Sequence, residues 1–403
     1  MRSLYKKASL IIGIYFLITL VYLIFNKDDA LNPEITQFIK LSEPVPPTDA
    51  HAMLYTLDAP IESDVISLGR QAISQFNLNN NSALTYGDIK ENYFDYKNKL
   101  DIKTDQSSSC LKELQLCFDD FKNNIRTFKK FNEIDKTISS RIKRLESSPP
   151  IGYAFESTSE TPHPKNQLRF HYQNRDFQRL IYLFINSEIQ YVFDYLLKDT
   201  QLKRSELKTN NTLIAKMIST KLIMNNIELL EIFSKQNKYQ AHIPEFVFEE
   251  IDMNLVYSKE YRTYYNIINE LYSGKNSEGV ITSEETIFDR FGKKAVIKPN
   301  KTLNSYYTMI QAQFWHQENT LDHYLTQDSN QFIDNDFSLN NFVGYLINST
   351  AIPNYSKYQL EVLKLSCLTS EYNKSINSNY SQTPLISNQQ CLLIESLLKK
   401  ENK

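Results

Sequence analysis

The chain contains little glycine, with 8 residues of this type among 403. Glycine supplies the backbone conformations of tight hairpins and of loops that wrap phosphate groups. Its scarcity argues against nucleotide-binding folds and compact β architectures, and no cofactor is expected. An excess of positive charge is also missing, because 45 Lys and Arg residues face 47 Asp and Glu residues. Binding of nucleic acid would require a basic surface, so no nucleic-acid partner is expected.

What the chain does contain is a long apolar run. Residues 8–26 are nineteen residues without a charged side chain, most of them Leu, Ile, Val, Phe or Tyr. A helix of that length would be about 28 Å long, close to the hydrocarbon thickness of a bilayer. The flanking charges are Arg2, Lys6 and Lys7 before the run and Lys27, Asp28 and Asp29 after it. The positive-inside bias then places the N-terminus in the cytoplasm and the remaining chain across the membrane.

The same run has a second interpretation, as a secretory signal peptide that is removed. A signal peptide has an apolar core of about 7–15 residues that is followed by small residues at a cleavage site. The run here is longer, and residues 25–29 (Phe-Asn-Lys-Asp-Asp) offer no such site. An uncleaved anchor that crosses the lipid bilayer through residues 8–26 is therefore favoured.

The anchor divides the chain into further segments. Residues 1–7 are predicted to form a cytoplasmic tail, and residues 27–50 an extended tether. The tether contains Pro33, Pro44, Pro46 and Pro47. Residues 51–403 are predicted to form a folded domain beyond the membrane, and a subdivision near residues 147–167 stays open.

Cysteine is limited to Cys110, Cys117, Cys367 and Cys391. An even number suits two disulfides in an oxidising compartment. Cys110 and Cys117 would lie about 10 Å apart on one straight helix, so their bridge requires Cys110 in a loop and a helix that begins near Cys117. A Cys367–Cys391 bridge would tie the last helix to the one before it. Four unpaired thiols are the alternative.

Apolar residues recur at helical spacing along most of the chain. Long predicted helices cover residues 118–145, 168–202 and 211–233, and weaker ones cover 244–252, 258–273, 302–325, 338–348, 357–370 and 388–399. The β-leaning pieces, 153–155 and 295–297, are too short for a sheet. No fixed repeat period is evident. The predicted fold is all-α, with an N-terminal transmembrane helix followed by an irregular antiparallel helical array.

Local signals refine this picture at two places. Asp64 stands where an N-cap is expected for a helix through residues 65–73, and Gly69 within that helix predicts the close approach of a neighbouring backbone. Basic residues recur on the first long helix over residues 122–144. They predict a solvated face, with acidic lipid or an acidic partner as the alternative.

The densest group of polar candidates for chemistry is His316, Asp322 and His323. The two histidines lie seven positions apart, or two helical turns, which is too far for one metal ion without further ligands. An ordinary helix surface is the favoured interpretation, so no metal site is expected. His163 and His171 likewise lack a visible catalytic partner. No catalytic residue is therefore predicted.

Several motifs in order resemble a family of uncharacterised bacterial inner-membrane proteins that have one anchor and a helical periplasmic domain. The motifs lie at residues 52–60 with Gly69, at the Cys110/Cys117 pair, at 211–218, at 298–304, and at 341–344 with Tyr358. Phe342 stands where this pattern has proline. The resemblance implies the bacterial inner membrane, with the C-terminal domain in the periplasm, and it brings no established activity.

Five motif residues have no role that the sequence assigns: Asn211, Lys216, Asn300, Asn304 and Gly344. Packing and capping are the favoured interpretation, and ligand binding is the alternative. In particular, Asn211 is expected to cap the helix that it opens, and Asn300 and Asn304 are expected to bracket a turn.

The sequence favours a membrane-anchored periplasmic helical protein that binds another protein, as an immunity protein or antagonist of a toxin or as an envelope scaffold. The alternative is a membrane-anchored hydrolase that acts on lipid or cell-wall material. That activity would need a cleft in which distant side chains such as His171, Glu318 and His323 meet.

Overall fold

The computed structural model describes the larger part of the chain. The described residues are 17, 27–80, 100, 110–124, 131–149, 154, 167–209, 212–237, 239, 241–246, 251, 253–273, 297–313, 321, 325, 341–351, 355–376 and 386–401. Within them the chain forms thirteen α-helices and no strand. The predicted all-α class is confirmed.

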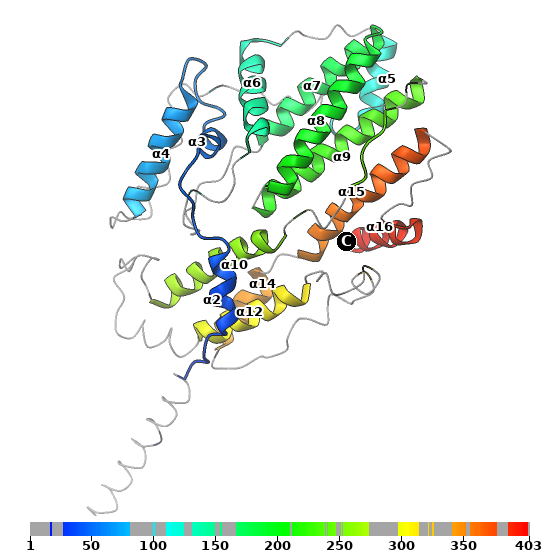
Figure 1. The fold of residues 1–403 in the computed structure, drawn as a ribbon. Coiled ribbons are helices and arrows are strands. Elements are labelled where there is room, and N and C mark those ends of the chain that lie inside the picture. Colours follow the sequence, from blue (N-terminus) through cyan, green and yellow to red (C-terminus); the bar gives the residue numbers. More distant parts are fainter. Residues whose placement is uncertain are drawn as a thin grey trace, which may run out of the picture.

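The helices pack in three neighbouring groups (Figure 1). The first consists of α7 (Gln167–Ile185), α8 (Ile189–Thr209) and α9 (Leu213–Gln236), with α5 (Leu114–Asn124), α15 (Tyr355–Ile376) and α16 (Asn388–Glu401). The second consists of α10 (Met253–Ser273), α12 (Pro299–Gln313) and α14 (Phe342–Ala351), with α2 (Pro33–Lys40) against α10. The third consists of α3 (Asp49–Tyr55), α4 (Val65–Asn80) and α6 (Glu133–Ser147), and α6 joins it to α7 and α8.

One large apolar core joins the first two groups. Aromatic rings pack against one another in this core: Phe184 stacks on Phe233 with ring centroids 4.2 Å apart, and Phe118 meets both rings edge-on. Phe38 of α2 meets Tyr261 and Tyr307 edge-on at 5.9 and 5.5 Å. Edge-on contact is a favoured geometry for aromatic pairs, and it lets a chain rich in Tyr and Phe fill a helical core.

A smaller core lies under α3, α4 and α6 and continues onto the start of α7. The two helices α3 and α4 approach each other backbone to backbone, because a Cβ on Gly69 would lie 2.4 Å from the carbonyl oxygen of Ala52. Asp64 accepts hydrogen bonds from the amides of Ile66 and Ser67 and thus caps α4. Both local predictions for this helix are confirmed.

Arg141 holds the loop between α3 and α4 against α6. Its guanidinium donates hydrogen bonds to the carbonyl oxygens of Leu57, Ala59 and Pro60 at 3.0, 2.6 and 2.7 Å, and to Ile61 at 3.4 Å. The side chain is buried, with 7% of its surface exposed. The predicted basic stripe is therefore wrong at Arg141, which faces the interior, whereas Lys143 and Arg144 are exposed.

Two predicted long helices are each divided in the structure. The helix predicted over residues 118–145 is α5 and α6, because Asn132 and Asp135 form a capping box that starts a new helix at Glu133. The helix predicted over 168–202 is broken at Ser187, whose φ is 70°. There the amides of Ser187 and Glu188 donate to Phe184 and Leu183, the paired bonds of a Schellman motif. The weak helix predicted over 244–252 is coil at residues 244–246.

Both predicted cysteine pairs lie at bonding distance. Cys110 lies in a turn ahead of α5, which begins at Leu114, and its Cα is 5.1 Å from that of Cys117. Cys367 and Cys391 join α15 to α16 with Cα atoms 5.7 Å apart. Both separations lie within the range of protein disulfides. The loop position that the sequence required for Cys110 is confirmed.

The N-terminal region differs from the prediction in part. The segment predicted as a tether over residues 27–50 is not an extended linker throughout, because residues 33–40 form α2, whose Ile35 and Phe38 are buried in the large core. No helix among the described residues is long and apolar enough to span a membrane. Of the predicted span over residues 8–26, only Leu17 belongs to the described part of the chain.

Candidate functional site

Four of the sequence-predicted site residues fall outside the described part of the chain. They are Asn211, His316, Asp322 and His323. The helix that Asn211 was expected to cap begins at Leu213, and its N-cap is Thr212, whose hydroxyl accepts from the amide of Ala215. Threonine is one of the preferred N-cap residues, so the cap lies one position later than predicted.

Lys216 lies on α9 and is fully buried. Its ammonium group donates a 2.8 Å hydrogen bond to the carbonyl oxygen of Leu207, in the last turn of α8. The carbonyls of a last helical turn lack partners within the helix, and a cation there also complements the helix dipole. Lys216, near the start of α9, thus caps the C-terminal end of α8.

Asn300 and Asn304 hold the segment that follows the apolar run. They lie in the first turns of α12, so the turn predicted for them is wrong. The Asn300 side chain donates to the carbonyl of Asp29, and the Asn304 side chain donates to the carbonyl of Ala30 at 2.8 Å. The Asn304 side-chain oxygen also accepts from the amide of Asn32 at 2.8 Å. We name this contact between residues 28–32 and the start of α12 the N-terminal clasp.

Asp28 completes the clasp from the other side. Its carboxylate accepts hydrogen bonds from the amides of Asn300 and Lys301 at 3.0 and 3.1 Å. Pro299 occupies the first position of α12 and has no amide hydrogen to offer. A residue 272 positions away in sequence thus caps α12, with its negative charge at the positive end of the helix dipole.

Gly344 of α14 lies at the contact with α12, and its lack of a side chain lets the two helices pack closely. A Cβ at Gly344 would lie 2.0 Å from the hydroxyl oxygen of Thr302 and 2.4 Å from the side-chain oxygen of Asn341. That Asn341 oxygen accepts from the amide of Lys298 and from the hydroxyl of Thr302. Asn341, like Thr302, is buried, so this polar group fixes α14 against the helix that carries the clasp.

A group of charged side chains is buried where α6, α7 and α8 meet. Arg169 of α7 donates to Glu206 of α8, and Lys203 of α8 contacts Asp199 at 2.5 Å. Glu146 of α6 lies 3.6 Å from Arg169 and 3.4 Å from Lys203. We name these five residues the buried ionic cluster.

Neutral side chains of α7 and α9 extend the buried ionic cluster. Asn226 donates to Asp199 at 2.8 Å, and Ser219 donates to Glu206 at 3.3 Å. Gln173 of α7 donates to Asn226 at 3.1 Å. The sequence carried a signal for the cluster: Asp199, Lys203 and Glu206 continue, at spacings of three and four, the apolar face that Val192 and Leu196 begin on α8.

The hydrolase alternative required His171 to meet Glu318 and His323, both of which lie outside the described residues. His171 itself lies between α6 and α7, with its Nε2 atom 3.8 Å from a carboxylate oxygen of Asp135. Burial lowers the pKa of His171, Asp135 opposes this effect, and Arg175 reinforces it. Asp135 also accepts a 3.1 Å hydrogen bond from Arg175. These contacts make His171 part of a helix–helix interface.

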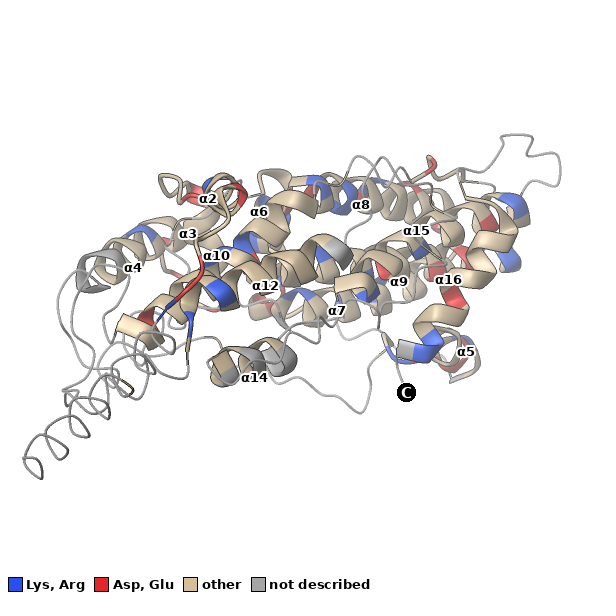
Figure 2. Ribbon diagram, turned by 90° about the horizontal axis from the view of Figure 1, so that it is seen from below, with Lys and Arg blue, Asp and Glu red and all other residues tan. Residues whose placement is uncertain are grey.

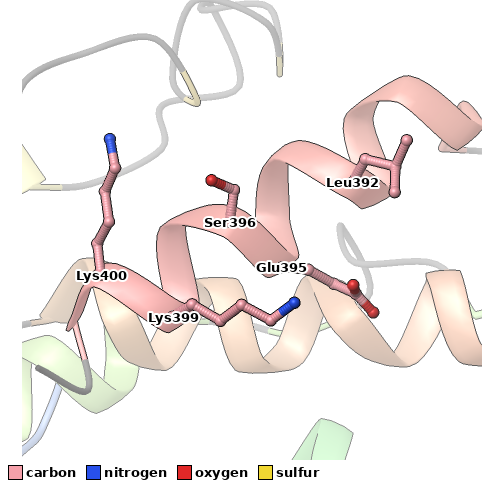
Figure 3. Close-up of a pocket in the computed structure, with 5 residues that line it drawn as sticks. All are labelled: Leu392, Glu395, Ser396, Lys399 and Lys400. Atoms are coloured by element: carbon pink, nitrogen blue, oxygen red, sulfur yellow. The ribbon is translucent and has the colours of Figure 1, made fainter.

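A shallow surface hollow lies along α16. Its lining residues are Leu392, Glu395, Ser396, Lys399 and Lys400, and Figure 3 shows all five side chains extending from this one helix. Leu392 is 70% exposed.

In the part of the chain that the structure describes, no group of three or more His, Cys, Asp or Glu side chains is placed to hold a metal ion. Figure 2 shows acidic and basic residues interspersed along the helices in that view.

The N-terminal clasp should protect two backbone amides of α12 from hydrogen exchange. Replacing Asp28 by alanine removes the cap of α12 and is expected to cost about 1 kcal/mol of stability. Hydrogen exchange of the Asn300 and Lys301 amides, which donate to Asp28, should accelerate. The control is Asp29→Ala, which removes the same charge from an exposed neighbouring side chain. Equal protection of both amides in the two variants would contradict the capping role.

In comparisons with known proteins, no protein family, no curated protein and no solved structure matches the chain.

Proposed function

We propose that the protein is a single-pass protein of the bacterial inner membrane that binds another protein through its helical periplasmic domain. Residues 8–26 would cross the lipid bilayer with the N-terminus in the cytoplasm. The partner would be a periplasmic protein, such as a toxin that this domain neutralises or a component of an envelope assembly. The N-terminal clasp is the observation that carries the proposal, because it determines how an anchored domain would be held.

The clasp leaves little chain between membrane and domain. Asp28 follows the apolar run after Lys27 alone, and its carboxylate is bonded to α12. Two residues extend at most about 7 Å. A bilayer entered at residue 26 would therefore lie next to the start of α12, and the domain would have a fixed orientation. One end of the domain would face the membrane and the opposite end would face the periplasm.

The turn between α7 and α8 lies at the end opposite α2 and α12 (Figure 1), and exposed aromatic and apolar side chains flank this turn. Tyr182 and Ile185 at the end of α7 and Tyr191 at the start of α8 are 38%, 40% and 48% exposed. Arg179 donates to the Tyr191 hydroxyl at 3.2 Å and lies 4.8 Å from the centre of the Tyr195 ring. Tyr and Arg are enriched among the residues that dominate binding energy at protein interfaces. We name this surface the α7–α8 corner and propose it as the binding surface.

The test is crosslinking of the full-length protein in its native membrane, followed by capture through a C-terminal tag and mass spectrometry. The variant Ile185→Ser/Tyr191→Ser changes the corner, and the matched control Ile61→Ser/Leu271→Ser changes two other exposed apolar residues. We expect the corner variant to bind the dominant partner at least about thirtyfold more weakly, since two residues that each contribute more than about 1 kcal/mol are removed together. No crosslinked partner, or equal retention by both variants, would refute the proposed binding surface.

A separate measurement tests the topology. A reporter enzyme that is active only in the periplasm, fused after Lys403, should be active in intact cells. The same reporter fused after Lys7 should be inactive. The reverse result would place the domain on the cytoplasmic side and would overturn the location independently of any partner.

A further inference from the structure

The buried ionic cluster holds one more acid than base. Its carboxyl groups are Glu146, Asp199 and Glu206, and its cations are Arg169 and Lys203. Four of these five side chains are at most 3% exposed, and Asp199 is 12% exposed. With every group ionised, the cluster would carry one uncompensated negative charge in the protein interior. Such a charge is expensive to bury, so one carboxyl group is expected to bind a proton.

Geometry identifies Glu146 as that carboxyl group. Arg169 has its closest carboxylate in Glu206, and Lys203 has its closest in Asp199 at 2.5 Å. Glu146 is farther from both cations, at 3.6 and 3.4 Å. The neutral donors that α9 contributes bond to the other two acids, Ser219 to Glu206 and Asn226 to Asp199. Two complete ion pairs thus remain when Glu146 is neutral.

The electrostatic surroundings agree with this assignment. Burial raises the pKa of Glu146 most strongly, and the nearby carboxylates Asp199 and Glu206 raise it further. Lys203 and Arg169 lower it but do not reverse the shift. The neighbouring pair Asp176–Arg179 on α7 is a matched pair, with 2.9 Å between its charged atoms.

We propose that Glu146 is a buried proton-binding group that couples the packing of α6 against α7 and α8 to pH. In its neutral form the cluster consists of two satisfied ion pairs, and the three helices pack without an excess charge. When Glu146 ionises, the excess charge weakens their contact. This inference concerns the domain itself and holds whether or not the proposed partner exists.

The sign of the effect follows from proton linkage. The folded state binds the Glu146 proton more tightly than the unfolded state does, because the folded pKa is raised above its ordinary value of 4.5. The contribution of protonated Glu146 to folding stability is therefore fully present at a pH below the ordinary glutamate pKa. It is lost as the pH rises through the pKa that Glu146 has in the folded state. An isosteric Glu146→Gln variant stays neutral at every pH and does not lose this contribution.

The experiment compares thermal unfolding of the full-length protein and Glu146→Gln between pH 5 and pH 8. The advantage in Tm of the variant should grow with pH, reaching about 2–4 °C at pH 8. The infrared carbonyl band of a protonated carboxyl group should be present in the wild type at pH 5 and diminished in the variant. Glu133→Gln, at an exposed position on the same helix, should change neither measurement.

A second variant tests the charge count itself. Glu206→Gln removes the acid closest to Arg169, so Glu146 becomes the partner of that cation and should ionise. The infrared band of protonated Glu146 should therefore disappear in Glu206→Gln at a pH at which the wild type retains it. A Tm difference for Glu146→Gln that does not depend on pH, or a carbonyl band in Glu146→Gln that is as strong as in the wild type, would overturn the inference.

Discussion

Replacing Arg141 by methionine is expected to destabilise the domain by about 3–5 kcal/mol, because each buried polar group left without a hydrogen-bond partner costs about 1–3 kcal/mol. Methionine fills a similar volume but donates no hydrogen bond. The substitution would leave the carbonyl oxygens of Leu57, Ala59 and Pro60 without their guanidinium donor. Unpaired polar groups in the interior lose their hydration without compensation, which is why the effect should be large.

The measurement for Arg141 is equilibrium unfolding in denaturant, followed by circular dichroism. Arg144→Met is the matched control, because Arg144 lies on the same helix with its side chain exposed. We expect Arg141→Lys to fall between wild type and Arg141→Met, since one ammonium group cannot reach all the carbonyls that the planar guanidinium serves. Similar midpoints for Arg141→Met and Arg144→Met would show that the loop does not need this donor.

Removing α2 is expected to have an effect at least as large. A protein that begins at residue 43 lacks Ile35 and Phe38, which are buried in the large core. Truncating one buried Ile or Phe side chain to alanine already costs about 2–5 kcal/mol. The deletion also removes the Phe38 carbonyl that accepts from the Ser258 hydroxyl, and the Ile39 carbonyl that accepts from Arg262. We expect this protein to unfold well below one that begins at residue 27, or to fail to fold.

Thermal unfolding of the two proteins, with binding of a hydrophobic dye, measures this difference. The version from residue 27 with Ile35→Ala and Phe38→Ala should reproduce much of the loss. The control, Thr36→Ala with Gln37→Ala, changes the exposed side of the same helix and should be nearly neutral. Equal stability of the proteins from residues 27 and 43 would restore the tether interpretation for the segment that contains α2.

Structural features could be predicted from the sequence where a residue type has one dominant structural role. Gly69 indicated a backbone contact, Asp64 indicated a helix start, and the spacing of Cys110 and Cys117 required a loop at the first cysteine. Helical periodicity likewise predicted the all-α class. Each of these inferences depends on local geometry, which the order of residues largely determines.

Prediction was wrong where a residue took an unusual role or depended on a distant partner. The end of α7 has Ser187 in the left-handed conformation that Gly usually occupies, so no glycine marked the break. Arg141 looked like one member of a basic face because its carbonyl partners lie 80 or more positions earlier in the chain. Asn300 and Asn304 suggested a local turn because their partners are more than 270 positions away.

The clasp also has a consequence for the order in which the chain can fold. The amide of Asn32 and the side chain of Asn304 are separated by 272 positions, so this contact cannot form until most of the chain has been synthesised. Closing so long a loop has an entropic cost that local helix contacts do not have. We therefore expect α2 to dock late in folding. Until then its binding surface on α10, including Tyr261, stays uncovered, and the nascent chain is most exposed to aggregation during this interval.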